Sequence, residues 1–181
     1  DGLNLVAGTA WMFSRKEFDG SFDYLFVDEA GQVSLANLIA MGTCASNIVL
    51  MGDQMQLGQP IQGVHPGRSG ESSLEYLLNR MATIPPDRGI FLKTTWRMHE
   101  NVCRFISDAV YDGRLEPKAA NNRQELVLSK GAHRSLRETG IVYIPAEHEG
   151  CSQQSKAEAT TVRTLYNSLL KQKYRDMKGI I

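Results

Sequence analysis

The sequence is organised around one stretch, Tyr24-Leu25-Phe26-Val27-Asp28-Glu29-Ala30-Gly31-Gln32. An apolar run ends there at two adjacent carboxylates, which are followed by a small residue and a glycine. This pattern predicts a buried strand that delivers its acids to the edge of a sheet, where open α/β sheets bind ligands. Asp28 and Glu29 would repel each other unless a cation lies nearby, and a divalent metal on a nucleotide phosphate is a usual one. The alternative is a structural strand followed by a helix N-terminus, where acids are also favoured.

The composition is that of a globular protein without a strong overall charge. The chain has 181 residues, of which 42% are hydrophobic and 22% charged, and its formal net charge is zero. No global field therefore attracts the chain to nucleic acid or membrane, although this does not exclude a local basic groove. Three widely spaced cysteines (Cys44, Cys103 and Cys151) indicate free thiols in a reducing compartment, so we predict a cytoplasmic location.

No apolar run is long enough to span a membrane, and no charged-then-apolar leader is visible. The chain opens on Asp1-Gly2 and stops in the apolar run Gly179-Ile180-Ile181. We therefore expect a fragment excised from a longer protein.

The first half of the chain reads as alternating strands and helices. Strands are predicted at residues 3–9, 21–27 and 48–51, and helices at residues 10–18, 35–41 and 73–81. Ser34 is a candidate N-cap for the second helix, and residues 59–73 are rich in Gly, Pro and Ser and predict a long loop. Polar residues at successive strand ends favour a parallel sheet covered by helices.

A break at Pro85-Pro86-Asp87-Arg88-Gly89 predicts a domain boundary, which gives domains at residues 1–88 and 89–181. In the second domain we predict strands at residues 90–92, 141–144 and 178–181, a polar loop at 118–135, and helices at 102–110 and 155–171. Gly113 can end the first of these helices, and a capping box at Ser155 to Glu158 begins the other. The two halves are predicted to be similar α/β layers.

Two further stretches carry candidate chemistry. Residues 52–60 read Gly52-Asp53-Gln54-Met55-Gln56-Leu57-Gly58-Gln59-Pro60 and follow a predicted strand. A Gln amide beside a metal-bound phosphate can orient a water molecule and sense the terminal phosphate, whereas the alternative is a Gly-rich turn with solvated Gln. Residues 94–99 read Thr94-Thr95-Trp96-Arg97-Met98-His99. Arg97 could neutralise charge in phosphoryl transfer, and the alternative is a surface arginine at a helix N-terminal turn.

Together these stretches resemble the superfamily-1B helicases of the Upf-like and Dna-helicase/nuclease-like branch, which have an AAA-type ATPase core. Residues 27–32 resemble the metal-and-base motif, and residues 52–57 with Pro60 resemble the coupling motif. Residues 96–99 resemble the arginine-finger motif. The helix that follows it in the family is matched here by Phe105, Ser107, Tyr111, Gly113 and Leu115.

The resemblance implies RecA-like P-loop NTPase folds, which are α/β folds with three-layer parallel sheets. Residues 1–88 would be the C-terminal part of the first RecA-like domain, and residues 89–181 the N-terminal part of the second. Residues 52–97 look most similar to bacterial proteins that join such a helicase to a RecB-like nuclease domain, so a covalently linked nuclease domain is a further expectation.

The resemblance also implies roles for individual residues in ATP hydrolysis. Asp28 would hold the Mg²⁺ bound to ATP, and Glu29 would be the general base for the attacking water. Gln56 would contact the terminal phosphate and that water, and so link hydrolysis to strand movement. Arg97 would supply positive charge to the transition state from the second RecA-like domain, and Asp53 would support the site near the phosphates.

The resemblance implies that the partner is single-stranded DNA or RNA, which Thr9 and Trp11 would contact. Gly8-Thr9 lies where the family has a nucleic-acid-contacting turn, and base stacking suits sequence-independent tracking. The alternative for Trp11 is an aromatic side chain that packs in the core or against a helix.

The sequence departs from the family at several places. It contains no G-x-x-x-x-G-K-[ST] loop and no later arginine motif, so we expect the chain alone not to hydrolyse ATP. Thr95 stands where the family usually has Gln, and Glu100 where it usually has Pro. Two rival functions stay open: a catalytically silent nucleic-acid-binding scaffold with the same fold, and a small-molecule P-loop phosphohydrolase.

Other catalytic chemistries have little support in the sequence. His65, His99, His133 and His148 lack metal-ligand spacing with cysteines or acids, so no zinc site is predicted. The serines at positions 72, 73 and 107 show no hydrolase arrangement with His and Asp.

Overall fold

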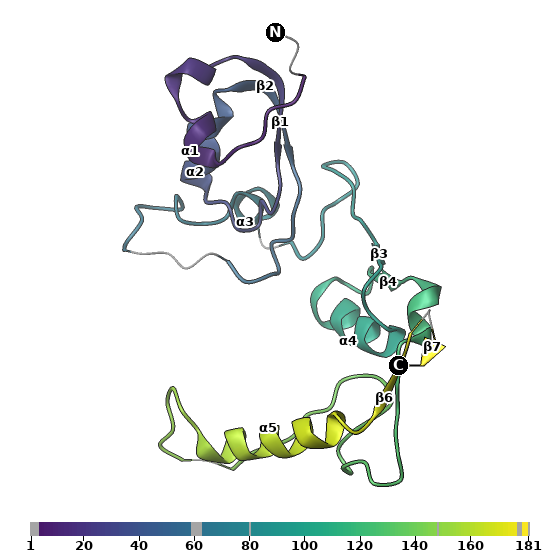
Figure 1. Ribbon diagram of the computed structural model, residues 1–181. Helices are drawn as coiled ribbons and strands as arrows, with labels where there is room; N and C mark the ends of the chain where they lie inside the picture. Colours follow the sequence, from purple (N-terminus) through teal and green to yellow (C-terminus); the bar gives the residue numbers. More distant parts are fainter. Residues whose placement is uncertain (1–3, 59–62, 80, 148, 177–178, 181) are drawn as a thin grey trace. The chain divides into compact units, whose positions relative to one another are not determined.

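The structure is a computed structural model that describes residues 4–58, 63–79, 81–147, 149–176 and 179–180 (Figure 1). It divides into two compact units, Asp1–Gly89 and Ile90–Ile181. Pro60 of the coupling motif, His148 and part of the predicted strand at 178–181 lie outside the described residues.

The first unit is built on a strand–helix–strand element, as predicted. Strands β1 (Phe22–Val27) and β2 (Ala45–Leu50) are parallel, and their register runs from Phe22 opposite Ala45 to Val27 opposite Leu50. Helix α2 (Leu35–Gly42) connects them, and the Ser34 hydroxyl accepts a hydrogen bond from the Asn37 amide at 3.2 Å, which confirms the predicted N-cap. The parallel pairing matters because both strands end at the same edge of the sheet.

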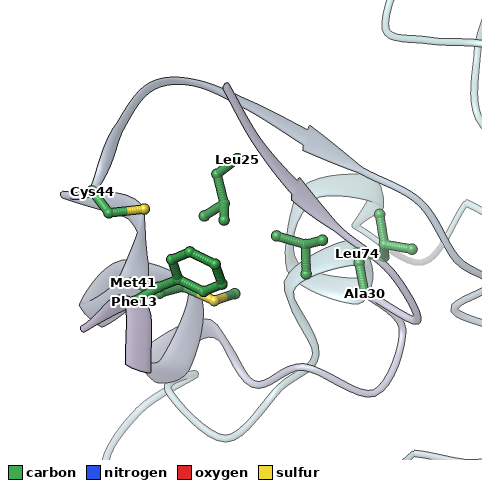
Figure 2. Packing of buried hydrophobic residues seen from close by; sticks show 7 residues of the cluster. Phe13, Leu25, Ala30, Met41, Cys44 and Leu74 are labelled. Carbon is green, nitrogen blue, oxygen red and sulfur yellow. The ribbon is translucent and has the colours of Figure 1, made fainter. Parts of the chain in front are cut away.

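An apolar cluster packs against one face of β1 in this unit (Figure 2). Leu25 and Val27 point from β1 toward α1 (Ala10–Phe13), α2 and α3 (Ser73–Leu78), because side chains alternate between the two faces of a strand. The buried members are Phe13, Leu25, Val27, Ala30, Met41, Cys44 and Leu74. The opposite face of β1 presents Tyr24 and Phe26, which are 58% and 60% exposed.

Several sequence predictions for the first unit are wrong in detail. Residues 4–9 form no strand and are exposed, since no neighbouring strand among the described residues pairs with them. The helix predicted at 10–18 is divided into α1 and a 3₁₀ turn, η1 (Lys16–Phe18). Strand β2 begins three residues earlier than predicted. Helix α3 ends at Leu78 because Asn79 takes a left-handed conformation, with φ 45°.

The second unit contains two small sheets and two helices. Strands β3 (Thr94–Thr95) and β4 (Glu116–Pro117) are parallel, and helix α4 (Glu100–Val110) lies between them in the chain. A 3₁₀ turn, η2 (Ala119–Arg123), leads to β5 (Glu125–Val127). Helix α5 (Lys156–Leu169) is followed by β6 (Lys173–Asp176) and β7 (Gly179–Ile180), and β5, β6 and β7 form an antiparallel sheet.

Local end signals in the second unit are confirmed, whereas several strand predictions are wrong. Gly113 has φ 70° and donates its amide to the Ser107 carbonyl at the end of α4, and Ser155 caps α5. Residues 90–92 and 141–144 form no strand, because apolar residues make a strand only where a neighbour pairs with the backbone. Residues 118–135 are not a continuous loop, since they contain η2 and β5.

The fold is therefore mixed α/β, as predicted. The parallel sheets among the described residues have two strands each, and the three-stranded sheet is antiparallel, so the second unit does not repeat the first.

The packing predicts which face of β1 stabilises the first unit. Leu25→Ala should lower the free energy of unfolding by about 2–5 kcal/mol, because it removes a buried side chain from the cluster. Tyr24→Ala, on the exposed face of the same strand, should cost less than about 1 kcal/mol. Urea unfolding followed by circular dichroism measures both, and equal losses would contradict the assignment of the buried face.

Candidate active site

The loops that follow β1 and β2 lie directly beside each other. The Met51 amide donates to the Val27 carbonyl at 2.9 Å, and the Ala30 amide donates to the Met51 carbonyl at 2.8 Å. These two hydrogen bonds continue the parallel ladder past the end of both strands. The acidic loop (residues 28–32) and the glutamine loop (residues 52–56) therefore share one edge of the sheet, as expected for parallel strands.

Two glycines make this approach possible. A Cβ atom on Gly31 would lie 2.2 Å from the Asp53 carbonyl oxygen, and one on Gly52 would lie 2.7 Å from the Ala30 amide nitrogen. Both neighbours are backbone atoms, which cannot move aside as the end of a flexible side chain can. The glycines thus set how closely the two loops pack.

The two predicted acids are exposed at this edge. The Asp28 carboxylate accepts the Glu29 amide through Oδ1 at 3.0 Å, and the Glu29 carbonyl accepts the Gln32 amide at 2.8 Å. Glu29 has φ 52°, a left-handed conformation that costs a non-glycine residue on the order of 1 kcal/mol. Such outliers concentrate at functional sites, where surrounding contacts hold them in place.

The glutamine loop has an internal support. Asp53 accepts the Met55 amide through Oδ1 at 2.9 Å and the Gln56 side-chain amide through Oδ2 at 3.1 Å. Asp53 therefore orients the exposed Gln56 side chain. Gln54 has a different place, because its side-chain amide donates to the carbonyls of Met81 and Ala82 at 3.0 and 2.7 Å and fixes the loop to that segment.

The structural role of Ser73 was not predicted from the sequence. This residue is fully buried at the start of α3, and its hydroxyl lies 3.0 Å from the carbonyl oxygens of both Ala30 and Val33. It therefore holds the backbone of the acidic loop from its buried side. No local signal could have shown this, because the partners are 40 or more residues away in the sequence.

Arg97 lies in the second unit, in the turn between β3 and α4. The Arg97 amide donates to the Thr95 hydroxyl at 3.3 Å, so the Thr that replaces the family's Gln contacts the turn. The Lys118 ammonium lies 4.3 Å from the centre of the Trp96 ring. Glu100 donates its amide to Asn122 at 3.1 Å, a bond that the family's proline could not make.

The predicted nucleic-acid contacts lie at the start of α1. Thr9 is its N-cap residue, and the Thr9 carbonyl accepts the amides of Met12 and Phe13 at 3.0 and 3.3 Å. The Trp11 side chain is 80% exposed. It therefore does not pack in the core of this unit, which was one of the two alternatives for this residue, the other being packing against a helix.

The described residues were also compared with the requirements of a metal site, a membrane span and a reactive thiol. Across the described residues, no group of three or more His, Cys, Asp or Glu side chains is placed to hold a metal ion. None of the helices in the described ranges is long and apolar enough to cross a membrane. All three cysteines are free, and burial raises the pKa of the Cys44 and Cys103 thiols, which disfavours their reactive thiolate form.

Comparison with known proteins identifies the class. A protein-family profile described as "AAA domain" matches residues 70–181, and a second profile with the same description matches residues 1–60. The chain therefore belongs to the AAA-domain family. Its curated relatives are helicases, which confirms the predicted superfamily-1 helicase type.

Three relatives illustrate this similarity. The chain is 32% identical over 122 residues to "Probable helicase MAGATAMA 3" of Arabidopsis thaliana, covering 62% of this chain and 14% of the relative. It is 30% identical over 115 residues to "DNA replication ATP-dependent helicase/nuclease dna2" of Schizosaccharomyces pombe, covering 63% and 8%. It is 31% identical over 121 residues to "DNA polymerase alpha-associated DNA helicase A" of the same yeast, covering 63% and 17%. The chain thus spans less than a fifth of the length of these relatives.

Because the two loops pack closely, a side chain added at Gly31 is predicted to lower the stability of the chain. Gly31→Ala should destabilise the chain by about 2 kcal/mol or more, because the new methyl group would overlap the Asp53 carbonyl. Gly58→Ala is the matched control, since nothing lies within 4 Å of its Cβ position, and it should change stability by less than about 1 kcal/mol. Urea unfolding of both variants checks this, and an unchanged midpoint for Gly31→Ala would show that the loops are not in contact.

Proposed function

We propose that the protein is an ATP-driven superfamily-1 helicase or translocase that acts on single-stranded nucleic acid, and that this chain carries part of its ATPase core. One observation carries the proposal. The acidic loop and the glutamine loop, which are distant in sequence, lie in backbone contact at one edge of a parallel sheet. This edge is where α/β folds bind nucleotides.

The proposed chemistry assigns a separate task to each exposed side chain. Glu29 accepts a proton from the attacking water as the general base, and Gln56, oriented by Asp53, orients that water against the terminal phosphate. Asp28 holds the magnesium ion of MgATP. A hard carboxylate oxygen suits Mg²⁺, which usually takes only one or two carboxylates and completes its shell with phosphates and water. When bound, the ion neutralises charge on the phosphates.

Arg97 is proposed to supply positive charge to the transition state, from its motif in the second unit. The two units are proposed to be parts of two RecA-like domains with three-layer parallel sheets, at residues 1–88 and 89–181. Their closure and opening would couple hydrolysis to movement along the strand. The sequence match of both halves to AAA domains supports this assignment.

The charge distribution supports a nucleic-acid partner. Residues 1–89 hold five Lys and Arg against ten Asp and Glu, whereas residues 90–181 hold 15 against 10. The net charge of zero is therefore the sum of a formal charge of −5 on the first unit and +5 on the second. A basic unit attracts a polyanion, and exposed Trp11 offers a stacking surface for bases.

Two features of the whole protein are also proposed. A linked nuclease domain, as in the bacterial RecB-like proteins, is supported by the relative named "helicase/nuclease". A cytoplasmic location is supported by the free thiols of Cys44 and Cys103, which suit a reducing compartment.

Glu29→Gln in the complete protein tests the proposed function. The amide cannot accept the proton, so ATP turnover should fall by about 100-fold or more, while ATP affinity stays within a few-fold of wild type. Glu17→Gln, which changes another exposed acid, is the control and should leave turnover unchanged. Steady-state hydrolysis and nucleotide binding measure the two effects. Normal hydrolysis by Glu29→Gln would show that the base is a different residue.

Trp11→Ala tests the nucleic-acid contact. Loss of one stacking surface should weaken binding of a single-stranded oligonucleotide by about tenfold, in line with about 1–3 kcal/mol for each stacked base. Ile39→Ala, which shortens an exposed side chain on α2, should leave binding unchanged. Fluorescence anisotropy with labelled DNA and RNA oligonucleotides measures the affinities. If wild type and Trp11→Ala bind the DNA and the RNA oligonucleotides with equal affinity, Trp11 does not contact the nucleic acid.

A further inference from the structure

The turn at residues 95–98 sets the position of Arg97. Trp96 and Arg97 lie in its middle, and both are exposed. Within the described part of the chain, no hydrogen bond or ion pair holds the Arg97 guanidinium group. Its location in the free protein therefore depends on the backbone of the turn.

Asn121, in η2, holds both ends of this turn. Its side-chain amide donates to the Thr95 carbonyl at 3.2 Å and to the Met98 carbonyl at 3.1 Å. These two carbonyls flank Trp96 and Arg97. Because one NH₂ group bridges them, the distance between the two ends of the turn is fixed.

The chemistry of this site suits asparagine. The residue is 3% exposed, and both partners of its side-chain amide are carbonyl oxygens, which its two N–H hydrogens can reach at once. The Asn121 backbone is itself held, since its amide donates to the Lys118 carbonyl at 2.8 Å and its carbonyl accepts the Gln124 amide at 3.0 Å. The Lys118 amide also donates to the Thr95 carbonyl at 2.9 Å. The turn is thus hydrogen-bonded to η2 and to its N-cap residue Lys118, more than 20 residues further along the chain.

The neighbouring Asn122 does something different. It is exposed, accepts the Glu100 amide at 3.1 Å and donates to the Glu100 carboxylate at 2.8 Å. It therefore contacts the start of α4 and leaves the turn to Asn121. This makes Asn122 a matched control on the same element.

We propose that Asn121 is a positioning residue that presents Arg97 for transition-state stabilisation. The inference rests on the proposed function of Arg97. Asn121 itself touches no substrate; it acts by holding the backbone that carries the guanidinium group. Loss of its two hydrogen bonds lets the turn change shape, so Arg97 spends less time in its productive position.

The test is a double-mutant cycle in the complete protein, measured by single-turnover ATP hydrolysis. Asn121→Ala should lower the hydrolysis rate by about tenfold, while ATP affinity changes by less than about threefold. In an Arg97→Ala background, the same substitution should cause no further loss, because there is no guanidinium group left to position. Asn122→Ala should leave the rate within about twofold of wild type.

The outcomes separate this inference from the proposed function. An undiminished rate for Asn121→Ala, or a tenfold loss that persists in the Arg97→Ala background, would overturn the positioning role. A full rate for Arg97→Ala would instead show that the proposed role of this arginine is wrong. If thermal denaturation shows that Asn121→Ala is not folded, the double-mutant cycle is repeated with Asn121→Ser, which keeps one hydrogen-bond donor. A smaller loss of hydrolysis rate that is absent in the Arg97→Ala background supports the positioning role of Asn121. A loss that persists in that background overturns it.

Discussion

The backbone contact between the two loops at the end of β1 and β2 is the constraint on which the candidate site depends. The loops that continue these strands approach each other so closely that a Cβ atom at two positions would overlap backbone atoms of the other loop. Gly31 and Gly52 occupy these two positions, and the amide of Ala30 closes the contact through the Met51 carbonyl. The exposed side chains of both loops are therefore placed by glycines that carry no chemistry themselves.

Around each motif, buried or half-buried polar side chains hold the backbone, whereas the side chains with a proposed chemical role are exposed. Ser73, Gln54 and Asn121 are partly or fully buried. The side-chain amides of Gln54 and Asn121 each donate to two backbone carbonyls, and the Ser73 hydroxyl lies within hydrogen-bond distance of two. Meanwhile Glu29, Gln56 and Arg97 are exposed. The side chains proposed to bind a phosphate or move a proton are thus exposed, and neighbouring polar side chains hold the backbone that carries them.

Local signals in the sequence predicted local structure well. The end of β1 at the acids, the Ser34 cap and the turn at Gly113 depend only on nearby residues. The apolar runs at 90–92 and 141–144 misled because a strand also needs a partner, which a local pattern does not reveal. Ser73 and Asn121 were missed for the same reason, since their acceptors lie 40–43 and 23–26 residues away. A net charge of zero likewise hid the opposite charges of the two units.

The most direct measurement is an experimental structure of the complete protein with Mg²⁺ and a non-hydrolysable ATP analogue. We expect the nucleotide phosphates to lie against the edge formed by the two glycine-containing loops. The carboxylate of Asp28 should face the metal ion, and Glu29 and Gln56 should lie within one water molecule of the terminal phosphate. A triphosphate bound on another surface, with this edge empty, would show that the two loops do not form the nucleotide site.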